Sequence, residues 1–192
     1  MSTEISFTWD SRDLEVWRGG KVEGALVRAL RLAGNQALRG MQRDSVQHVT
    51  SRKLMRDADV VKGLPLVFPS RKDAIRDLVW REKVSGKVVA LSKLPHIQTK
   101  RGVSVRVNVG GSTRRIKSAF IARVHSGHVG IFRRRGKARY PLDHLVTTRL
   151  SDVMQDGGVI PKIERAAYTK IQSAFERGLT RELKKLRRRG EA

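Results

Sequence analysis

Residues 118–144, "SAFIARVHSGHVGIFRRRGKARYPLDH", decide which fold this chain adopts. Two apolar runs, SAFIARV (118–124) and HVGIF (128–132), lie on either side of a short polar stretch, a pattern typical of a β-hairpin. Five cations then fall within seven positions, 133–139, before a Tyr-Pro-Leu-Asp step ends the run. The stretch therefore predicts antiparallel strands that lead directly into a concentrated positive charge.

This positive charge extends well beyond the hairpin. Residues 83–142 contain fifteen Lys and Arg and no Asp or Glu, whereas the whole chain has 41 basic against 18 acidic residues, a net charge of +23. A surface of like charge costs folding free energy through self-repulsion unless a polyanion or an acidic partner neutralises it. The segment predicts such a partner, with a merely solvated basic face as the alternative.

The acid-free segment also has the residue pattern of β-strands. KVVAL (87–91) is one short apolar run, and in VSVRVNV (103–109) the valines alternate strictly, so that Val103, Val105, Val107 and Val109 would share one face. Gly110 and Gly111 mark a turn after it. Together with the hairpin, these runs predict an antiparallel β-sheet over about residues 83–133.

Helical periodicity dominates on both sides of this sheet. A long amphipathic helix is predicted from Lys21 to about Val49, although Gly34 and Gly40 weaken it, and a second one over residues 159–188, where Pro161 lies in the first turn. The apolar positions of the first are Val22, Leu26, Ala29, Leu30, Ala33, Ala37, Leu38 and Met41. Those of the second are Ile163, Ala167, Ile171, Ala174, Phe175, Leu179, Leu183 and Leu186.

Shorter elements complete the expected fold. Residues 5–9 alternate as a strand does, residues 11–17 and 71–80 suit short helices, and residues 60–69 suit a connection. We therefore expect a single α+β domain over residues 1–192, with helices on one face of the sheet. Its parts are a mainly helical region (1–82), a basic β-sheet region (83–142) and a C-terminal helix (159–188).

The sequence offers no group of residues suited to catalysis or metal binding. Cysteine is absent, Asp57 and Asp59 are two positions apart and do not face each other on a helix, and His125 and His128 lack further zinc ligands nearby. No apolar run reaches the roughly 20 residues of a membrane span. The N-terminus lacks the features of a signal peptide. We expect a soluble intracellular protein that is not an enzyme and needs no metal or cofactor.

The basic segment points to backbone contacts rather than to base recognition. Between Lys83 and Phe120 there is no Phe, Trp or Tyr, and proteins that bind single strands stack bases on such side chains. Phosphate contact needs only Lys and Arg and gives no choice of sequence. The predicted chemistry is charge complementarity to a nucleic-acid backbone or to an acidic protein surface.

The block from Arg114 to Leu145 resembles the minor tail protein Z family of tailed phages, also called tail completion proteins. The matching features are an Arg-Arg pair at 114–115, the Ala-Phe-Ile strand at 119–121, the turn at 125–128, and the Gly-Lys-x-Arg-Tyr-Pro-Leu step at 136–142. LSKLPHIQ (91–98) resembles the family's Leu-Pro approach to the sheet. Chain length and the helices before and after the sheet also agree.

This resemblance implies a structural component of the virion tail, assembled in the host cytoplasm. Such proteins act at the head-proximal end of the tail, beside the tail terminator, the tail tube and the head connector proteins. They are thought to form a ring, expected to be a hexamer, through which double-stranded genomic DNA passes without sequence-specific contact.

In such a ring the cations would repeat around a channel. The expected DNA- or partner-facing cluster is Arg133, Arg134, Arg135, Lys137 and Arg139, with Arg114, Arg115 and Lys117 as a secondary basic group. Phe120 belongs to the structural motif, Tyr140 and Pro141 would end the basic loop, and Asp143 could cap the element after that loop. The cluster could instead dock on an acidic tail protein or remain solvated.

Two other functions stay open at this point. A free nucleic-acid-binding protein without sequence preference would have a similar charge, and a tail terminator would also form a ring. The distal part of the C-terminal helix, Leu179 to Leu186, would pack either in its own subunit or on the next one.

Overall fold

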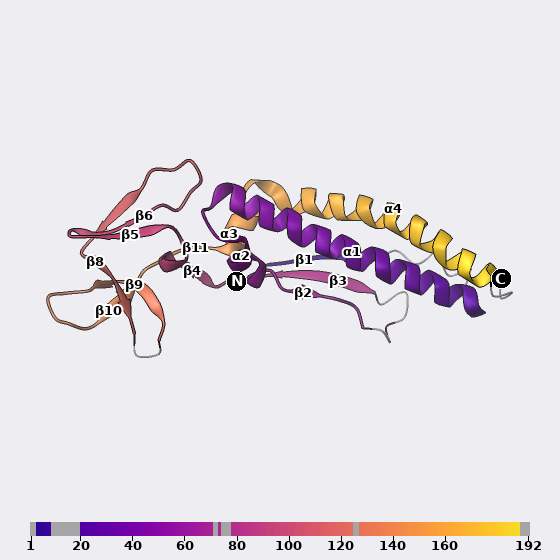
Figure 1. The fold of residues 1–192 in the computed structure, drawn as a ribbon, viewed down its shortest axis with the longest axis horizontal. Helices are drawn as coiled ribbons and strands as arrows, with labels where there is room; N and C mark the ends of the chain where they lie inside the picture. Colours follow the sequence, from indigo (N-terminus) through magenta and orange to yellow (C-terminus); the bar gives the residue numbers. More distant parts are fainter. Residues whose placement is uncertain (1–2, 9–19, 71–72, 74–77, 125–126, 189–192) are drawn as a thin grey trace. The chain divides into compact units, whose positions relative to one another are not determined.

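The computed structural model describes residues 3–8, 20–70, 73, 78–124 and 127–188 of the chain. The chain divides into two compact units, each of which we describe by itself. The β-rich unit comprises Val46–Gly63 and Ser85–Gly157, and the helical unit comprises Thr3–Ser45, Leu64–Val84 and Gly158–Ala192. Helix α1 (Gly20–Arg52) begins in the helical unit and ends in the β-rich unit (Figure 1).

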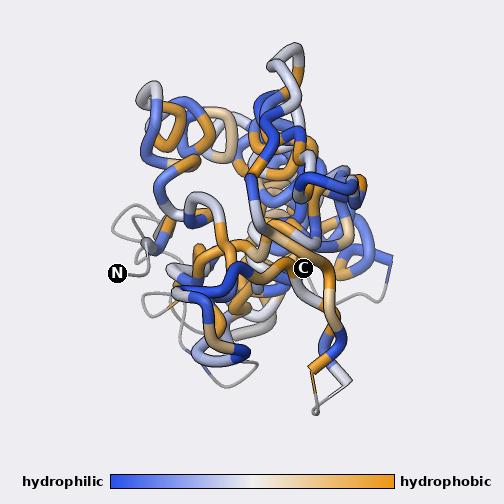
Figure 2. Tube along the Cα trace, turned by 90° about the vertical axis from the view of Figure 1, so that its left-hand side faces the viewer, coloured by the Kyte–Doolittle hydropathy of each residue, from blue (hydrophilic) through white to orange (hydrophobic). Residues whose placement is uncertain are grey.

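Two long helices, α1 and α4 (Val159–Arg188), run side by side in the helical unit (Figure 1). Their direction is antiparallel, because Arg28 pairs with Glu182 while Asp44 pairs with Lys170. Figure 2 shows hydrophobic and hydrophilic residues interspersed along the chain. In α1 and α4 the buried hydrophobic residues recur at helical spacing. Both predicted helices are confirmed: α1 extends slightly further than its predicted range, and α4 has the predicted bounds.

The apolar stripe of α4 packs within its own unit over most of its length. Residues from Ile163 to Phe175 are buried at the predicted positions, and Leu186, near the C-terminal end, is also buried. Leu183 is exposed, and Leu179 is half-buried. The distal part of the helix therefore contributes Leu186 to its own subunit and leaves Leu183 on the surface.

A three-stranded antiparallel sheet of order β1-β3-β2 completes the helical unit. It contains β1 (Thr3–Thr8), β2 (Leu66–Val67) and β3 (Val79–Val84). Ile5 and Leu66 both lie opposite Glu82 of the central strand. The strand predicted at residues 5–9 is confirmed for 5–8, and the helix predicted at 11–17 lies outside the described residues.

The helix predicted over residues 71–80 is wrong at its end, where Val79 and Trp80 begin strand β3. Trp80, Glu82 and Val84 are buried and the residues between them are more exposed, which is the period of two of a strand. Pairing with β1 and β2 satisfies the backbone here and outweighs local helical propensity. Residues 71–72 and 74–77 lie outside the described part of the chain.

A glycine in the middle of α1 makes room for the largest side chain of the helical core. A Cβ atom at Gly34 would lie 2.2 Å from the Trp80 ring, far inside van der Waals contact. The indole Nε1 donates a hydrogen bond of 2.9 Å to Oδ1 of Asn35 on the same helix. Gly34, which weakens the helix on propensity grounds, is thus required for packing.

The β-rich unit is built from short strands and short helices. Its strands are β4 (Val88–Ala90), β5 (His96–Thr99), β6 (Gly102–Val105), β7 (Arg114–Lys117), β8 (Ala119–Arg123), β9 (Val129–Arg134), β10 (Leu142–His144) and β11 (Val146–Arg149). Its helical segments are α2 (Asp57–Lys62), η3 (Leu91–Lys93) and α3 (Leu150–Gln155), with η4 (Asp156–Gly158) at the end of the unit.

These strands form several antiparallel sheets. One has the order β10-β9-β8, another has the order β5-β6-β7, and β11 pairs with β4. Their shared aliphatic core consists of Leu91, Leu94, Val103, Val105, Ala119 and Ile131. The α+β fold class with long helices before and after the β region is confirmed, while the strands divide among small sheets and continue to Arg149.

The long strand predicted over residues 103–109 ends at Val105. Beyond it the backbone bonds to the end of α1, since Leu54 N–H donates to the Val107 carbonyl and Val109 N–H to the Arg52 carbonyl. Val109 is consequently exposed. The valine alternation does not continue the sheet because the hydrogen-bonding partners of the backbone change.

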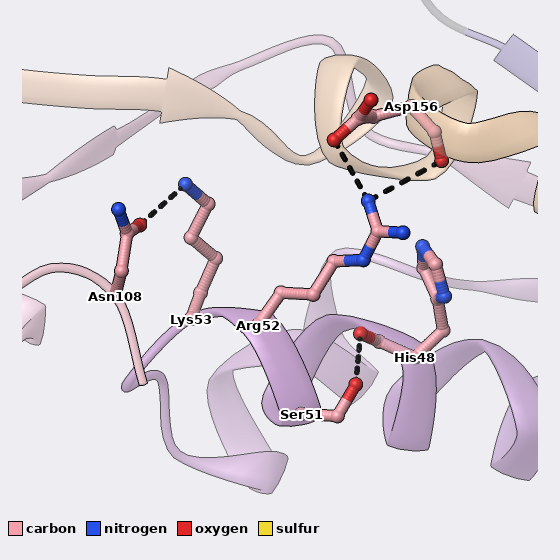
Figure 3. Close-up of polar contacts among 6 residues, drawn as sticks. All are labelled: His48, Ser51, Arg52, Lys53, Asn108 and Asp156. Carbon is pink, nitrogen blue, oxygen red and sulfur yellow. Dashed lines mark hydrogen bonds and ion pairs between the residues drawn. The ribbon is translucent and has the colours of Figure 1, made fainter. Parts of the chain in front are cut away.

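Side chains fix the same end of α1 in the β-rich unit (Figure 3). The Nη1 atom of Arg52 donates to Oδ2 of Asp156 at 2.7 Å, and Nζ of Lys53 donates to Oδ1 of Asn108 at 2.7 Å. Ser51 Oγ donates to the His48 carbonyl at 2.8 Å. The helix terminus is thereby tied both to η4 and to the segment that comes after β6.

No helix in the described part of the chain is long and apolar enough to span a membrane.

Candidate nucleic-acid interface

The β8–β9 hairpin positions the basic cluster. Its register runs from Ala119 opposite Arg133 to Arg123 opposite Val129, which confirms the predicted hairpin; the turn residues 125–126 lie outside the described residues. Ala119 and Ile131 are buried in the core of the unit. Because the hairpin is anchored by these residues, the cations that come after them are held at one end of β9.

Strand alternation divides the cluster between the two faces of the sheet. Arg133 lies opposite Asp143 and on the side of buried Ala119, whereas Arg134 lies opposite Leu142. The Arg134 guanidinium stands over the Phe120 ring, 5.6 Å from its centroid. The arginines that are adjacent in sequence are therefore presented in two directions, and both are exposed.

Arg135 pairs with the one carboxylate of this region. Its Nη2 and Nε atoms donate to Oδ1 of Asp143 at 2.8 and 3.2 Å. Asp143 lies inside strand β10, so the prediction that it caps the next element is wrong: its side chain is engaged across the strand pair instead. This ion pair closes the base of the loop between β9 and β10.

The loop itself is exposed from Arg135 to Pro141. Arg139 stands over the ring of Tyr140, 5.9 Å from its centroid, and Tyr140 is 66% exposed. Strand β10 begins directly after Pro141, so the Tyr-Pro step does end the basic loop. Lys137 and Arg139 thus extend the positive surface beyond the sheet.

The secondary basic group lies in a different sheet. Arg114, Arg115 and Lys117 are exposed on β7, an outer strand of the β5-β6-β7 sheet. Their neighbour Ile116 is half-buried against the core. The structure therefore presents this group and the main cluster on separate strands of the same unit.

Carboxylates are scarce in the β-rich unit. Its ranges contain nineteen Lys and Arg against five Asp and Glu, a net charge of +14. Asp156 is paired with Arg52, Asp143 with Arg135, and Asp59 with Arg56 and Lys93. Burial acts to raise the pKa of Asp59, but these two cations outweigh it and hold the pKa below its usual value. Most cations of this unit consequently have no carboxylate partner among the described residues.

Sequence reasoning missed a series of rings on the Arg134 side of the sheet. Phe120, Phe132 and His144 lie opposite one another on β8, β9 and β10. Their ring centroids are separated by 6.5 and 5.1 Å, and His128 lies next, at 5.5 Å from His144. Counting aromatic residues along the chain could not find this series; aligning the predicted strands in register would have brought Phe120 and Phe132 together.

Among the described residues no group of three or more His, Cys, Asp or Glu side chains is placed to hold a metal ion. His128 and His144 come close only as a pair.

Comparisons with known proteins identify the family to which these features belong. No curated protein and no solved structure matches the chain. The family model for prophage minor tail protein Z (GPZ) matches residues 22–189, which covers nearly the whole chain. The basic hairpin, α4 and all but the first two residues of α1 lie inside the matched range, and the chain belongs to the prophage minor tail protein Z family, a family of phage tail components.

Proposed function

We propose that this minor tail protein acts at the head-proximal end of the tail, as a ring whose β-rich units surround the passing genomic DNA. The observation that carries the proposal is the exposed basic cluster at the end of β9, in a unit of net charge +14. Of the five cations at 133–139, only Arg135 has an ion pair among the described residues, and its partner is Asp143. The remaining cations are free to face a polyanion.

A ring turns an unfavourable concentration of charge into a useful one. In a free monomer the cations repel one another, but repeated around a channel they form a collar against the phosphates of DNA. Screening limits this effect to about 8 Å at physiological salt, so only DNA threaded close to the collar would be bound. Phosphate contacts carry no sequence information and let the duplex slide.

The expected neighbours are set by this position. A hexamer would match the symmetry of the tail, with the tail terminator or tail tube protein on one side and head connector proteins on the other. The same cluster could instead dock on an acidic surface of one of these proteins, and neutralising the cluster separates the two arrangements.

The first experiment is deletion of this gene in its parent phage, scored by electron microscopy and by titre. Tailed, DNA-filled particles that fail to infect are the expected result, because the head-proximal end would be incomplete. Particles and titre equal to those of the parent would contradict the proposal and favour a free nucleic-acid-binding protein instead.

The second experiment replaces Arg133, Arg134 and Arg135 together by Gln. All three are exposed, so the variant should fold. Infectivity should fall, and the slope of log duplex affinity against log salt concentration should decrease by about 3. The matched control replaces Arg177, Arg181 and Lys184, three exposed cations of α4, and removes the same charge from the helical unit. A lost titre with unchanged duplex affinity would assign the cluster to protein docking. A titre equal to that of the wild type would contradict the proposed DNA collar.

A further inference from the structure

The β10-β9-β8 sheet has a second face that shares only Arg134 with the basic cluster. One face carries Ala119 and Ile131 into the core of the unit. The opposite face carries Phe120, Phe132 and Arg134 with their strand partners, and His128 lies beside His144. We call the five side chains on this second face the ring face: Phe120, His128, Phe132, Arg134 and His144.

The rings of this face are packed in series and not merely near one another. Phe132 lies between Phe120 and His144, with centroids 6.5 and 5.1 Å away, and the two histidine rings meet edge to face at 5.5 Å. A glycine makes this possible: a Cβ atom at Gly130 would lie 2.9 Å from the Phe132 ring and 3.0 Å from Nε2 of His144. The Phe132 and His144 rings therefore pack over strand β9 at Gly130, which has no side chain to displace them.

Exposure differs among the members in a useful way. Phe132 is only 6% exposed and forms the base of the series, and Phe120 is half-buried. His128, Arg134 and His144 are exposed. The buried ring holds the outer groups in place, so a planar ligand would meet two imidazoles and one guanidinium that are already positioned.

Planar groups of this kind on a sheet face are what unpaired nucleobases stack on. Aromatic rings, histidine and the guanidinium plane of arginine all serve as stacking surfaces for splayed bases. Carboxylates do not interrupt this face, because Asp143 points with Arg133 and Arg135 to the other side of the strands. Arg134 and the loop cations Lys137 and Arg139 supply positive charge for the phosphates of the same strand.

We propose that the ring face binds single-stranded nucleic acid, with bases stacked on His144, His128 and the Arg134 guanidinium. This goes beyond the proposed collar, because a duplex in a channel presents phosphates and keeps its bases stacked inside. The ring face therefore predicts a preference for single strands that charge alone does not give. The exposed members are imidazole and guanidinium groups and not aliphatic side chains, which favours a base over an apolar peptide.

The experiment measures binding of the full-length protein to a fluorescent thymidine oligonucleotide and to a duplex of the same length, over a series of salt concentrations. Phosphate contacts weaken as salt is raised, whereas stacking persists. Two variants at one exposed position separate ring from charge: His144→Tyr keeps a planar ring, and His144→Lys supplies a cation without a ring. Phe120→Leu tests the half-buried ring while preserving apolar volume.

At raised salt we expect His144→Lys and Phe120→Leu to lower single-strand affinity about tenfold, with His144→Tyr close to wild type and duplex affinity lowered in none of the three. Arg133→Gln, on the opposite face, is the matched control and should weaken both ligands together. Equal effects of His144→Tyr and His144→Lys, or parallel losses for single strand and duplex, would overturn the proposal. Equal thermal stability of the variants excludes misfolding as the cause.

These outcomes are independent of the collar. Neutralising residues 133–135 tests the channel and also removes Arg134 from the ring face, whereas the contrast between tyrosine and lysine at position 144 bears on the ring face alone.

Discussion

The two units of this protein handle positive charge in different ways. The helical unit has 22 basic and 13 acidic residues, a net charge of +9, and the β-rich unit has 19 and 5. In the helical unit, carboxylates on one element meet cations on another: Glu182 with Arg28, and Asp44 with Lys170. In the β-rich unit Asp59, Asp143 and Asp156 pair with four cations, and most of the other cations are exposed.

This difference separates charge that stabilises the fold from charge that is available to a partner. In the helical unit a larger number of carboxylates offsets the basic residues, and ion pairs such as Arg28–Glu182 and Lys170–Asp44 lower the repulsion between the two long helices. In the β-rich unit the surplus falls on strand ends and loops around a small aliphatic core. A partner that neutralises charge should therefore act on the β-rich unit, and substitutions in the helical unit should act on stability.

The largest expected effect is a packing change in the helical unit. Gly34→Ala places a Cβ atom 2.2 Å from the Trp80 ring, which is buried and must shift, and should destabilise the fold by about 3 kcal/mol or more. Gly40→Ala is the matched control, because its nearest neighbour, the Lys170 side chain, lies at an ordinary 3.5 Å; it should stabilise α1 by about 0.5–1 kcal/mol. Denaturant unfolding measures both, and equal effects would contradict the packing seen at Trp80.

The next effect concerns a buried carboxyl group at the centre of the β1-β3-β2 sheet. Burial raises the pKa of Glu82 to about 7, the hydrogen bond donated by Ser45 at 3.0 Å opposes this rise, and the charge of Asp44 adds to it. Since the folded pKa lies above the unfolded value of 4.5, the protonated group stabilises the fold at low pH, and this stability is lost as pH rises towards 7.

Replacing Glu82 by Gln should remove this dependence. At pH 4.5 and below, the free energies of unfolding of the variant and the wild type should differ little. As pH rises above 7, the free energy of unfolding of the wild type should fall by roughly 3 kcal/mol relative to that of the variant. Unfolding measured across this pH range checks the expectation. A constant difference at every pH would show that Glu82 does not change its protonation in the folded protein.

A smaller effect is expected where a carboxylate joins the two long helices. Hydrogen bonds from Lys185 and Arg28 hold the pKa of Glu182 below its usual value, so its contribution is present at neutral pH and is lost as pH falls through the folded pKa. Glu182→Gln should cost about 1–2 kcal/mol at neutral pH. The melting temperatures of the two proteins should become equal in acid. A difference that persists at low pH would mean that the substitution acts through packing and not through charge.

The smallest effect is expected for the exposed ion pair in the β-rich unit. Arg135 and Asp143 are both partly open to water, and such pairs contribute little to stability, so Asp143→Asn should change it by about 0.5 kcal/mol or less. The same variant frees Arg135 from its carboxylate, so it should also bind duplex DNA more tightly. Tighter binding would show that unpaired charge in the β-rich unit is available to a partner. A loss well above 1 kcal/mol would mean that the pair holds the loop together.

Regular periodicity made the long helices and the β8–β9 hairpin predictable. The apolar spacing of α1 and α4 and the two apolar runs on either side of the 125–128 turn are local patterns, and each element forms where its pattern lies. Prediction failed where backbone partners come from far along the chain. Val79 and Trp80 join β1 across more than seventy residues, and Val107 and Val109 leave their sheet to bond the end of α1.

The basic cluster was predicted residue by residue, and all five of its cations are exposed. Its division between two faces was not, because it depends on where β9 begins and on which residue lies opposite Arg133. The ring face was missed for the same reason. Its members are distant in sequence, and only the register of three strands makes them neighbours.

The sequence by itself determined the α+β class, the long helices, the hairpin and the location of the charge surplus, because each is written in the spacing or composition of a short segment. Only the tertiary structure decided which cations form ion pairs with carboxylates, why α1 needs a glycine where it packs against Trp80, and which aromatic rings pack around Gly130. These properties depend on pairs of residues, and a pair is fixed by packing and strand register rather than by either residue alone.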